Sequence, residues 1–98
     1  MTNYGKEIEE RKVYDELISI LRRHTKYPEL LINAKPEAHL IHDLKVKSIR
    51  LVDVFLACED SYGIIINDEE ADRLRTIGEV VEAIEKKISE KNNGVTHI

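Results

Sequence analysis

The 98-residue chain contains few cysteine, proline and aromatic residues. Its one cysteine, Cys58, excludes an internal disulfide and a zinc site built from cysteines, and it is compatible with a reducing compartment. There is no tryptophan and only one phenylalanine, whereas 35% of the residues are charged. This composition favours helices with solvated faces over a β-sandwich.

Long hydrophobic runs are also missing. No apolar stretch approaches the roughly 20 residues that cross a bilayer, and residues 1–6 lack the apolar core of a secretory signal. We therefore expect a cytoplasmic protein without a membrane span. The length predicts a single domain over residues 1–98. A chain of this size buries about 60–65% of its unfolded surface, which suits a small core but not a deep enzymatic cleft.

The net charge of −4 is unevenly distributed. Residues 1–47 carry nine Lys/Arg and eight Asp/Glu, for a net +1; residues 48–74 carry two and seven, for −5; residues 75–98 carry four of each. An acidic surface repels nucleic acid and attracts basic partners. A solvated helix face has the same pattern, so charge alone leaves both interpretations open.

Hydrophobic periodicity predicts four helices, over residues 5–23, 48–62, 68–73 and 77–90, followed by a frayed tail over 92–98. The stripes of the first and last helices are formed by Val13, Tyr14, Leu17, Ile18 and Leu21, and by Ile77, Val80, Val81, Ile84 and Ile88.

Capping boxes predict where the last two helices begin. Asn67 is followed three residues later by Glu70, and Thr76 in the same way by Glu79. The connection over residues 24–47 is unusually long for a compact domain. We expect it to be pinned by its large apolar side chains, which are Leu30, Leu31, Ile32, Leu40, Ile41 and Leu44.

Ser48 stands where a charged loop gives way to the helix over 48–62. Serine is a favoured N-cap, so Ser48 is either a plain cap or the attachment point of a covalent cofactor. Gly63 is a good C-terminal stop for the same helix. Its predicted core face consists of Leu51, Phe55, Cys58 and Tyr62. Ile49, Val52 and Leu56 form a second apolar strip, which a helix with one core face does not need.

No catalytic or metal-binding set is evident in the sequence. The histidines lie outside the predicted helices, without a motif that pairs them with a nucleophile; they are His24, His39, His42 and His97. A pair such as His39 and His42 lacks the further ligands that zinc requires. The acidic run 67–72 lacks the glycine of a calcium loop. An enzyme with Ser48 as nucleophile has no evident base.

Two stretches of the chain resemble the acyl carrier protein family. Asp43-Leu44 and Ser48-Ile49 are similar to the loop and the serine motif that open the family's second helix. Residues 66–78, which contain Ile66-Asn67-Asp68-Glu69-Glu70-Ala71-Asp72, are similar to its third helix and the entry to the fourth. The stronger match covers residues 43–84.

The resemblance implies an all-α four-helix bundle that is not an enzyme, with 4′-phosphopantetheine esterified to Ser48. The arm carries acyl groups as thioesters, and Lys47 would neighbour its phosphate. Implied partners are a phosphopantetheinyl transferase and acyl-transferring or acyl-activating enzymes, which dock on the second helix. The matching docking positions are Ile49, Arg50, Val52, Asp53, Leu56, Glu59 and Asp60. We expect a freestanding monomer of a specialised lipid, fatty-acid or polyketide-type pathway.

Three positions around the serine depart from the family pattern. Lys47 replaces an aspartate, Lys45 replaces a glycine, and Arg50 occupies a position that is often acidic. Partners that recognise this end through basic residues would meet like charge. The protein is therefore either a carrier with its own set of partners, which we favour, or an unmodified carrier-like module for protein interaction.

Overall fold

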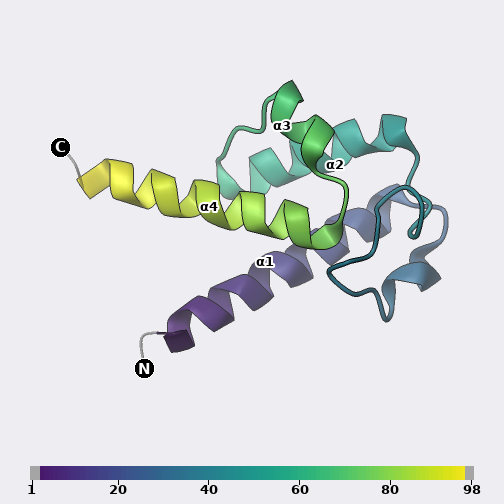
Figure 1. The fold of residues 1–98 in the computed structure, drawn as a ribbon, viewed down its shortest axis with the longest axis horizontal. Coiled ribbons are helices and arrows are strands. Elements are labelled where there is room, and N and C mark those ends of the chain that lie inside the picture. Colours follow the sequence, from purple (N-terminus) through teal and green to yellow (C-terminus); the bar gives the residue numbers. More distant parts are fainter. Residues whose placement is uncertain (1–2, 97–98) are drawn as a thin grey trace.

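The chain folds into helices, seen in a computed structural model that describes the backbone of residues 3–96 and the side chains of residues 12–91 (Figure 1). In order these are α1 (Asn3–His24), the 3-10 helix η1 (Pro28–Leu31), α2 (Ser48–Tyr62), α3 (Asp68–Arg73) and α4 (Ile77–Thr96). The described residues form no strand beyond one isolated bridge between His39 and Thr76. The expected all-α fold is therefore confirmed.

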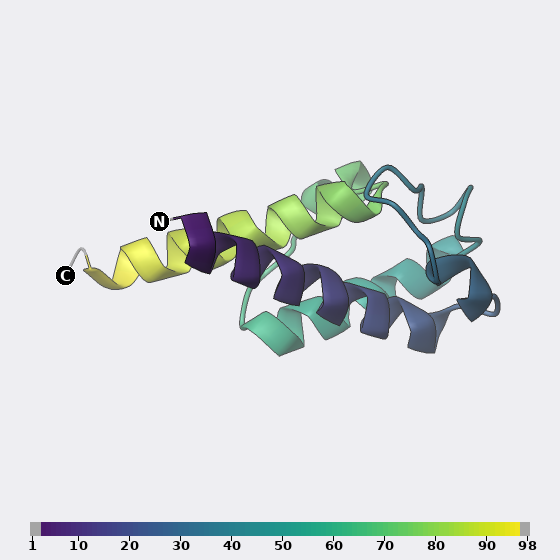
Figure 2. The same cartoon turned by 90° about the horizontal axis from the view of Figure 1, so that it is seen from below.

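Three long helices pack lengthwise around a shared core. α1 contacts both α2 and α4, and α2 also contacts α4. α2 and α4 run back along α1 in the opposite direction, so the start of α2 lies at the end of the molecule where α1 finishes (Figures 1 and 2). Ser48 thus lies far from the end at which α1 begins.

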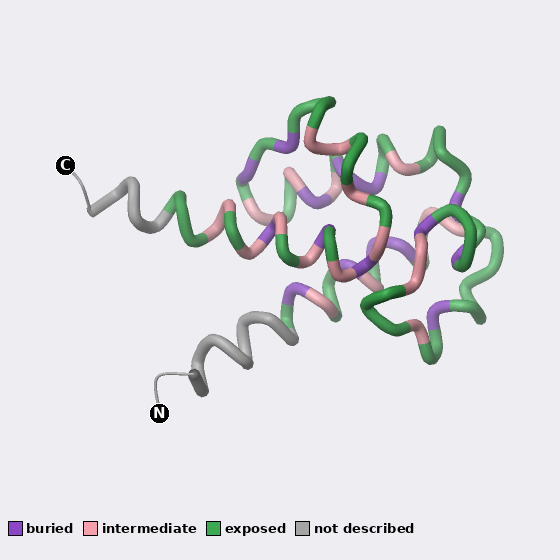
Figure 3. Tube along the Cα trace, viewed as in Figure 1, coloured by how far each residue is buried: buried purple, intermediate pink, exposed green. Residues whose placement is uncertain are grey.

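The buried residues, whose positions along the chain are marked in Figure 3, are mostly large and aliphatic. The predicted stripe residues Val13, Leu17 and Leu21 are buried, and so are Ile77, Val80 and Ile84 of the other stripe. Ile20 is fully buried too but falls outside the predicted stripe. Because α1 packs against two helices, its buried face is wider than a single stripe.

The capping residues act as predicted. Asn67 and Glu70 form a reciprocal capping box at the start of α3. At α4, the Glu79 N–H donates to Thr76 Oγ1 (3.1 Å), and Glu79 Oε1 accepts the Thr76 N–H (3.0 Å). Gly63 ends α2 in the left-handed conformation, with φ 62°. These local signals explain why the sequence predicts the bounds of α2 and α3 well.

The last helix extends beyond its predicted end at residue 90. The backbone of α4 stays helical to Thr96, and residues 97–98 lie outside the described residues. Extending an existing helix adds one hydrogen bond per residue without a new nucleation step, so the weak helix formers Asn92, Asn93 and Gly94 do not end it.

The long connection between α1 and α2 is pinned, as expected, by some of its apolar side chains. Leu31, Leu40 and Leu44 are buried, whereas Leu30, Ile32 and Ile41 are exposed. Backbone hydrogen bonds tie the segment to the start of α4: the Leu40 N–H donates to the Arg75 carbonyl (2.8 Å) and the Gly78 N–H donates to the Pro36 carbonyl (2.8 Å).

A side chain at position 78 would press on the connection, because a Cβ there would lie 3.2 Å from the Pro36 carbonyl oxygen. Glycine therefore permits the close approach of this segment to α4.

Candidate functional site: the start of helix α2

Ser48 is the first residue of α2, and its side chain is exposed. Of the two roles that the sequence left open for Ser48, that of a plain helix cap is contradicted by the structure. The N-cap is Lys47, whose backbone is extended (φ −70°, ψ 142°) and whose carbonyl accepts the N–H groups of Arg50 (2.8 Å) and Leu51 (3.2 Å). No side-chain hydrogen bond caps this helix. The Ser48 hydroxyl is therefore not engaged in capping and faces solvent.

Alternating burial holds the segment before Ser48 in place. Leu44 and Val46 are buried, and the Val46 N–H donates to the Leu40 carbonyl (3.0 Å), whereas Lys45 and Lys47 are exposed. Lys45 adopts a positive φ of 60°. This left-handed conformation suits glycine, which is the residue that the family pattern has at this position.

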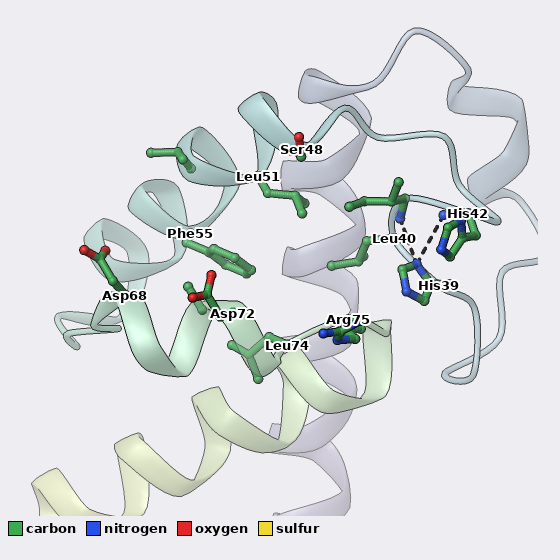
Figure 4. A pocket seen from close by; sticks show the side chains of 13 residues that line it. His39, Leu40, His42, Ser48, Leu51, Phe55, Asp68, Asp72, Leu74 and Arg75 are labelled. Atoms are coloured by element: carbon green, nitrogen blue, oxygen red, sulfur yellow. Dashed lines mark hydrogen bonds between the residues drawn. The ribbon is translucent and has the colours of Figure 1, made fainter.

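Ser48 opens onto a groove of about 430 Å³ between α2, α3 and the connection (Figure 4). Leu51 and Phe55 of α2 line one wall, and Leu40 and Leu74 contribute further apolar surface. In the view of Figure 4, Ser48 lies at the upper edge, between Asp68 on the left and His42 on the right.

The two histidines at the mouth of the groove have a structural role in the connection. The rings of His39 and His42 lie 4.3 Å apart, and His39 Nδ1 accepts the N–H groups of Ile41 and His42 at 3.2 Å each. The His39 N–H in turn donates to Asp43 Oδ2 at 2.7 Å. Among the side chains of residues 12–91, no cluster of three or more potential metal ligands is found. His97 lies outside the described residues.

The second apolar strip of α2 faces solvent. Ile49, Val52 and Leu56 are 76%, 59% and 56% exposed. On the predicted core face, Phe55 and Cys58 are buried, Leu51 and Tyr62 are half-buried, and Val54, which the sequence pattern did not assign to the core, is fully buried.

The acidic residues of α2 differ in availability. Asp53 and Asp60 are exposed, and Asp53 Oδ2 lies 3.6 Å from Arg50 Nη1. Glu59 is half-buried, and its Oε2 accepts the Ile66 N–H at 2.7 Å. Glu59 therefore also holds the turn between α2 and α3.

A second hollow, of about 470 Å³, lies on the other side of the serine motif. It brings the end of α1 to Lys45, Lys47 and Arg50, and its lining includes Arg23 and Lys26. Sequence reasoning missed this arrangement, since Arg23 and Lys26 are more than 20 residues away along the chain from the serine. The run of basic residues at the end of the first helix was visible, but not its position in space.

Two ionisable groups of the interior are kept neutral. Burial raises the pKa of the Cys58 thiol to about 12, with the carboxylates of Glu16 and Glu59 adding to the effect. Burial also raises the pKa of Tyr62 to about 12, with a further contribution from Glu16. Neither group is poised as a nucleophile near neutral pH.

Comparison with known proteins agrees with the geometry. No protein-family model matches the chain. The chain is 32% identical over 84 residues to an acyl carrier protein of Coprothermobacter proteolyticus, a match that covers 86% of this chain and all of that protein. It is 40% identical over 57 residues to the meromycolate extension acyl carrier protein of Mycolicibacterium aurum, covering 58% of each. The helical fold and the full-length match place this chain in the acyl carrier protein family, whose members are carriers and not enzymes.

Proposed function

We propose that the protein carries acyl groups on 4′-phosphopantetheine esterified to Ser48. The observation that carries this proposal is the position of Ser48 at the start of α2, beside an apolar groove of about 430 Å³. Its hydroxyl is exposed and makes no capping hydrogen bond. The N–H groups of Ser48 and Ile49, which begin the first helical turn, suit a phosphodiester, and Lys47 adds a nearby positive charge. When bound, the group supplies a thiol that holds acyl chains as thioesters.

The other residues of the site have one of two proposed roles: they shield the acyl chain from water or they contact partner enzymes. Leu51, Phe55 and Leu74 offer an apolar surface on which an acyl chain is shielded from water. We propose that Ile49, Val52 and Leu56 contact partner enzymes, together with Arg50, Asp53, Glu59 and Asp60. These partners are a phosphopantetheinyl transferase and enzymes that activate or transfer acyl groups.

We further propose a cytoplasmic monomer that serves a specialised lipid, fatty-acid or polyketide-type pathway. The basic residues around Ser48 support specialisation, since they change the charge that a partner meets there. Among the described residues no helix is long and apolar enough to cross a membrane.

Modification is tested by intact mass after incubation with a phosphopantetheinyl transferase and coenzyme A. The unaltered protein and Ser61→Ala, which removes another exposed serine of α2, should each gain one phosphopantetheine. Ser48→Ala should gain none. If no form gains mass with several different transferases, or if Ser48→Ala is modified as well, the proposed attachment at Ser48 is wrong.

The basic collar of Lys45, Lys47 and Arg50 favours one alternative function, an unmodified module for protein interaction. This alternative predicts that Ser48 is unmodified in cells and that the Ser48→Ala variant binds its physiological partner with unchanged affinity. Isolation of the protein from its native host, followed by intact mass, separates the two functions.

A further inference from the structure

The hollow beside Ser48 is lined almost entirely by basic and polar side chains, and we call it the cationic pocket. Three segments build it: the end of α1 with the turn that follows, the loop before α2, and the first turn of α2. Its lining residues are Arg23, His24, Thr25, Lys26, Tyr27, Lys45, Lys47 and Arg50. No carboxylate lines it.

Positive charge gathers there with little neutralisation from the side chains of residues 12–91. Of the five Lys and Arg residues, Arg50 has an acidic neighbour, Asp53, at 3.6 Å, and this pair is exposed. The first turn of α2 holds no acidic residue, although that end of a helix dipole favours anions. The basic residues at the end of α1 are favoured by the negative end of the α1 dipole. The positive charges of Lys45, Lys47 and Arg50 are not explained by a helix dipole.

One residue of the pocket, Lys45, has an unfavourable backbone conformation. Lys45 has a φ of 60°, a left-handed region that residues with a side chain disfavour. The Thr25 hydroxyl donates to the Leu44 carbonyl at 3.5 Å and so links the two rims of the pocket. A glycine would relieve the strain at position 45 but would remove one of the charges.

We infer that the partner enzyme acting at Ser48 docks an acidic surface in the cationic pocket. This inference rests on the proposed function and names the charge of its partner. All five Lys and Arg residues of the pocket are exposed, so a protein surface that lies over the pocket can contact them together. Tyr27, 47% exposed, adds an aromatic side chain of the kind enriched at interfaces.

The pocket is also continuous with the exposed strip of α2. Arg50 belongs to the pocket and lies on the first turn of the helix that presents Ile49 and Val52. One partner surface can therefore cover both, with acidic side chains over the pocket and apolar ones over the strip. Such complementary charge mainly speeds association and excludes partners of the wrong charge.

The test uses labelled hexaglutamate peptide as the probe, with binding followed by fluorescence anisotropy and by NMR shifts of backbone amides. We expect saturable binding, shifts concentrated in residues 23–27 and 45–50, and weaker binding as ionic strength rises. The charge-reversed variant Lys26→Glu/Lys47→Glu should bind at least about tenfold more weakly. The matched variant Lys86→Glu, which reverses an exposed lysine of α4, should bind within about twofold of the unaltered protein.

Three results would overturn the inference: no saturable binding, equal weakening by Lys86→Glu, or shifts located outside the pocket. Inorganic phosphate and pyrophosphate serve as a second arm. Tighter binding of either than of the peptide at this pocket would assign it to a small anion instead. Circular dichroism and urea unfolding show whether the double variant is folded, and Lys45→Gln supplies a milder loss of charge.

The peptide experiment is repeated on Ser48→Ala so that its outcome is independent of modification. If that variant binds the peptide but the unaltered protein never gains phosphopantetheine, the pocket stands and the carrier assignment of Ser48 falls. If modification occurs but the peptide does not bind, the pocket inference alone falls.

Discussion

Lys45 shows what a single residue contributes at this site. Its side chain adds positive charge to the cationic pocket, while its backbone has the left-handed conformation that favours glycine. Backbone stability therefore favours glycine at position 45, whereas the charge of the pocket favours lysine. Such local conflicts between backbone preference and residue identity are typical of functional sites.

Lys45→Gly should raise the free energy of unfolding by about 0.5–1 kcal/mol. Relief of the left-handed strain is worth about 1–2 kcal/mol, and the greater freedom of glycine in the unfolded chain offsets about 0.5–1 kcal/mol of it. Urea unfolding followed by circular dichroism measures the change. Lys35→Gly, at another exposed lysine of the connection, serves as the control and should not stabilise. Destabilisation by Lys45→Gly comparable to the control would contradict the strain argument.

Ser48 also marks a limit of sequence reasoning at this scale. Its position at the helix start was predictable from the residue type and the apolar period that follows. Which residue caps the helix was not, because Lys47 takes the extended backbone conformation that defines an N-cap. The difference in capping free energy between serine and lysine is smaller than the free energy gained by burying Leu44 and Val46. Burial of these two side chains therefore fixes the conformation of the segment.

At the scale of the element, α2 has two apolar faces, one buried in the core and one exposed to solvent. Val54 and Phe55 are buried in the core, whereas Val52 is 59% exposed in the strip that we propose contacts partners. The sequence predicted the exposed strip from periodicity alone. It missed Val54, because the pattern of α2 was assigned one core face and the helix contacts both α1 and α4.

The two valines of α2 provide a matched test. Val54→Ala should destabilise by about 2 kcal/mol, because it removes buried methyl groups and leaves a cavity. Val52→Ala should stay within about 0.5 kcal/mol of the unaltered protein. Phe55→Ala should cost about 3–5 kcal/mol. Thermal and urea unfolding measure all three. Equal, large losses at positions 52 and 54 would show that the strip is part of the core.

At the scale of the whole molecule, the fold brings together residues whose proximity no local pattern records. The end of α1 meets the start of α2 because α2 runs back along α1. The apolar periods predicted the helices, and the caps predicted their starts, since both depend on neighbours within a few residues. The cationic pocket depends on the packing of segments over 20 residues apart, so the sequence alone could not place Arg23 and Lys26 beside Lys47.

Stability of the whole molecule should fall at alkaline pH. Cys58 and Tyr62 have pKa values of about 12 in the folded protein, above their ordinary values of 9.0 and 10.0. Between those values the folded state binds more protons than the unfolded state, so the free energy of unfolding decreases as pH rises. That stabilisation is fully present below about pH 9 for Cys58 and pH 10 for Tyr62, and is lost as the pH approaches 12.

Tyr62→Phe isolates the tyrosine in this prediction. The Tyr62 hydroxyl is buried without a hydrogen-bond partner among the described residues, so its removal should not destabilise the protein at pH 8. The stability advantage of the variant over the unaltered protein should then grow from pH 10 to pH 12. Urea unfolding across this range gives the difference. Parallel curves for the two proteins would show that Tyr62 does not contribute.

The complete burial of Cys58 has a practical consequence. It is the chain's one cysteine, so the folded polypeptide offers no accessible thiol of its own. A maleimide dye added near neutral pH would therefore remain unreacted until a thiol-bearing arm is attached at the surface. Fluorescence in a gel band would therefore count the molecules whose attached arm has a free thiol, with neither a cysteine-free variant nor a mass spectrometer.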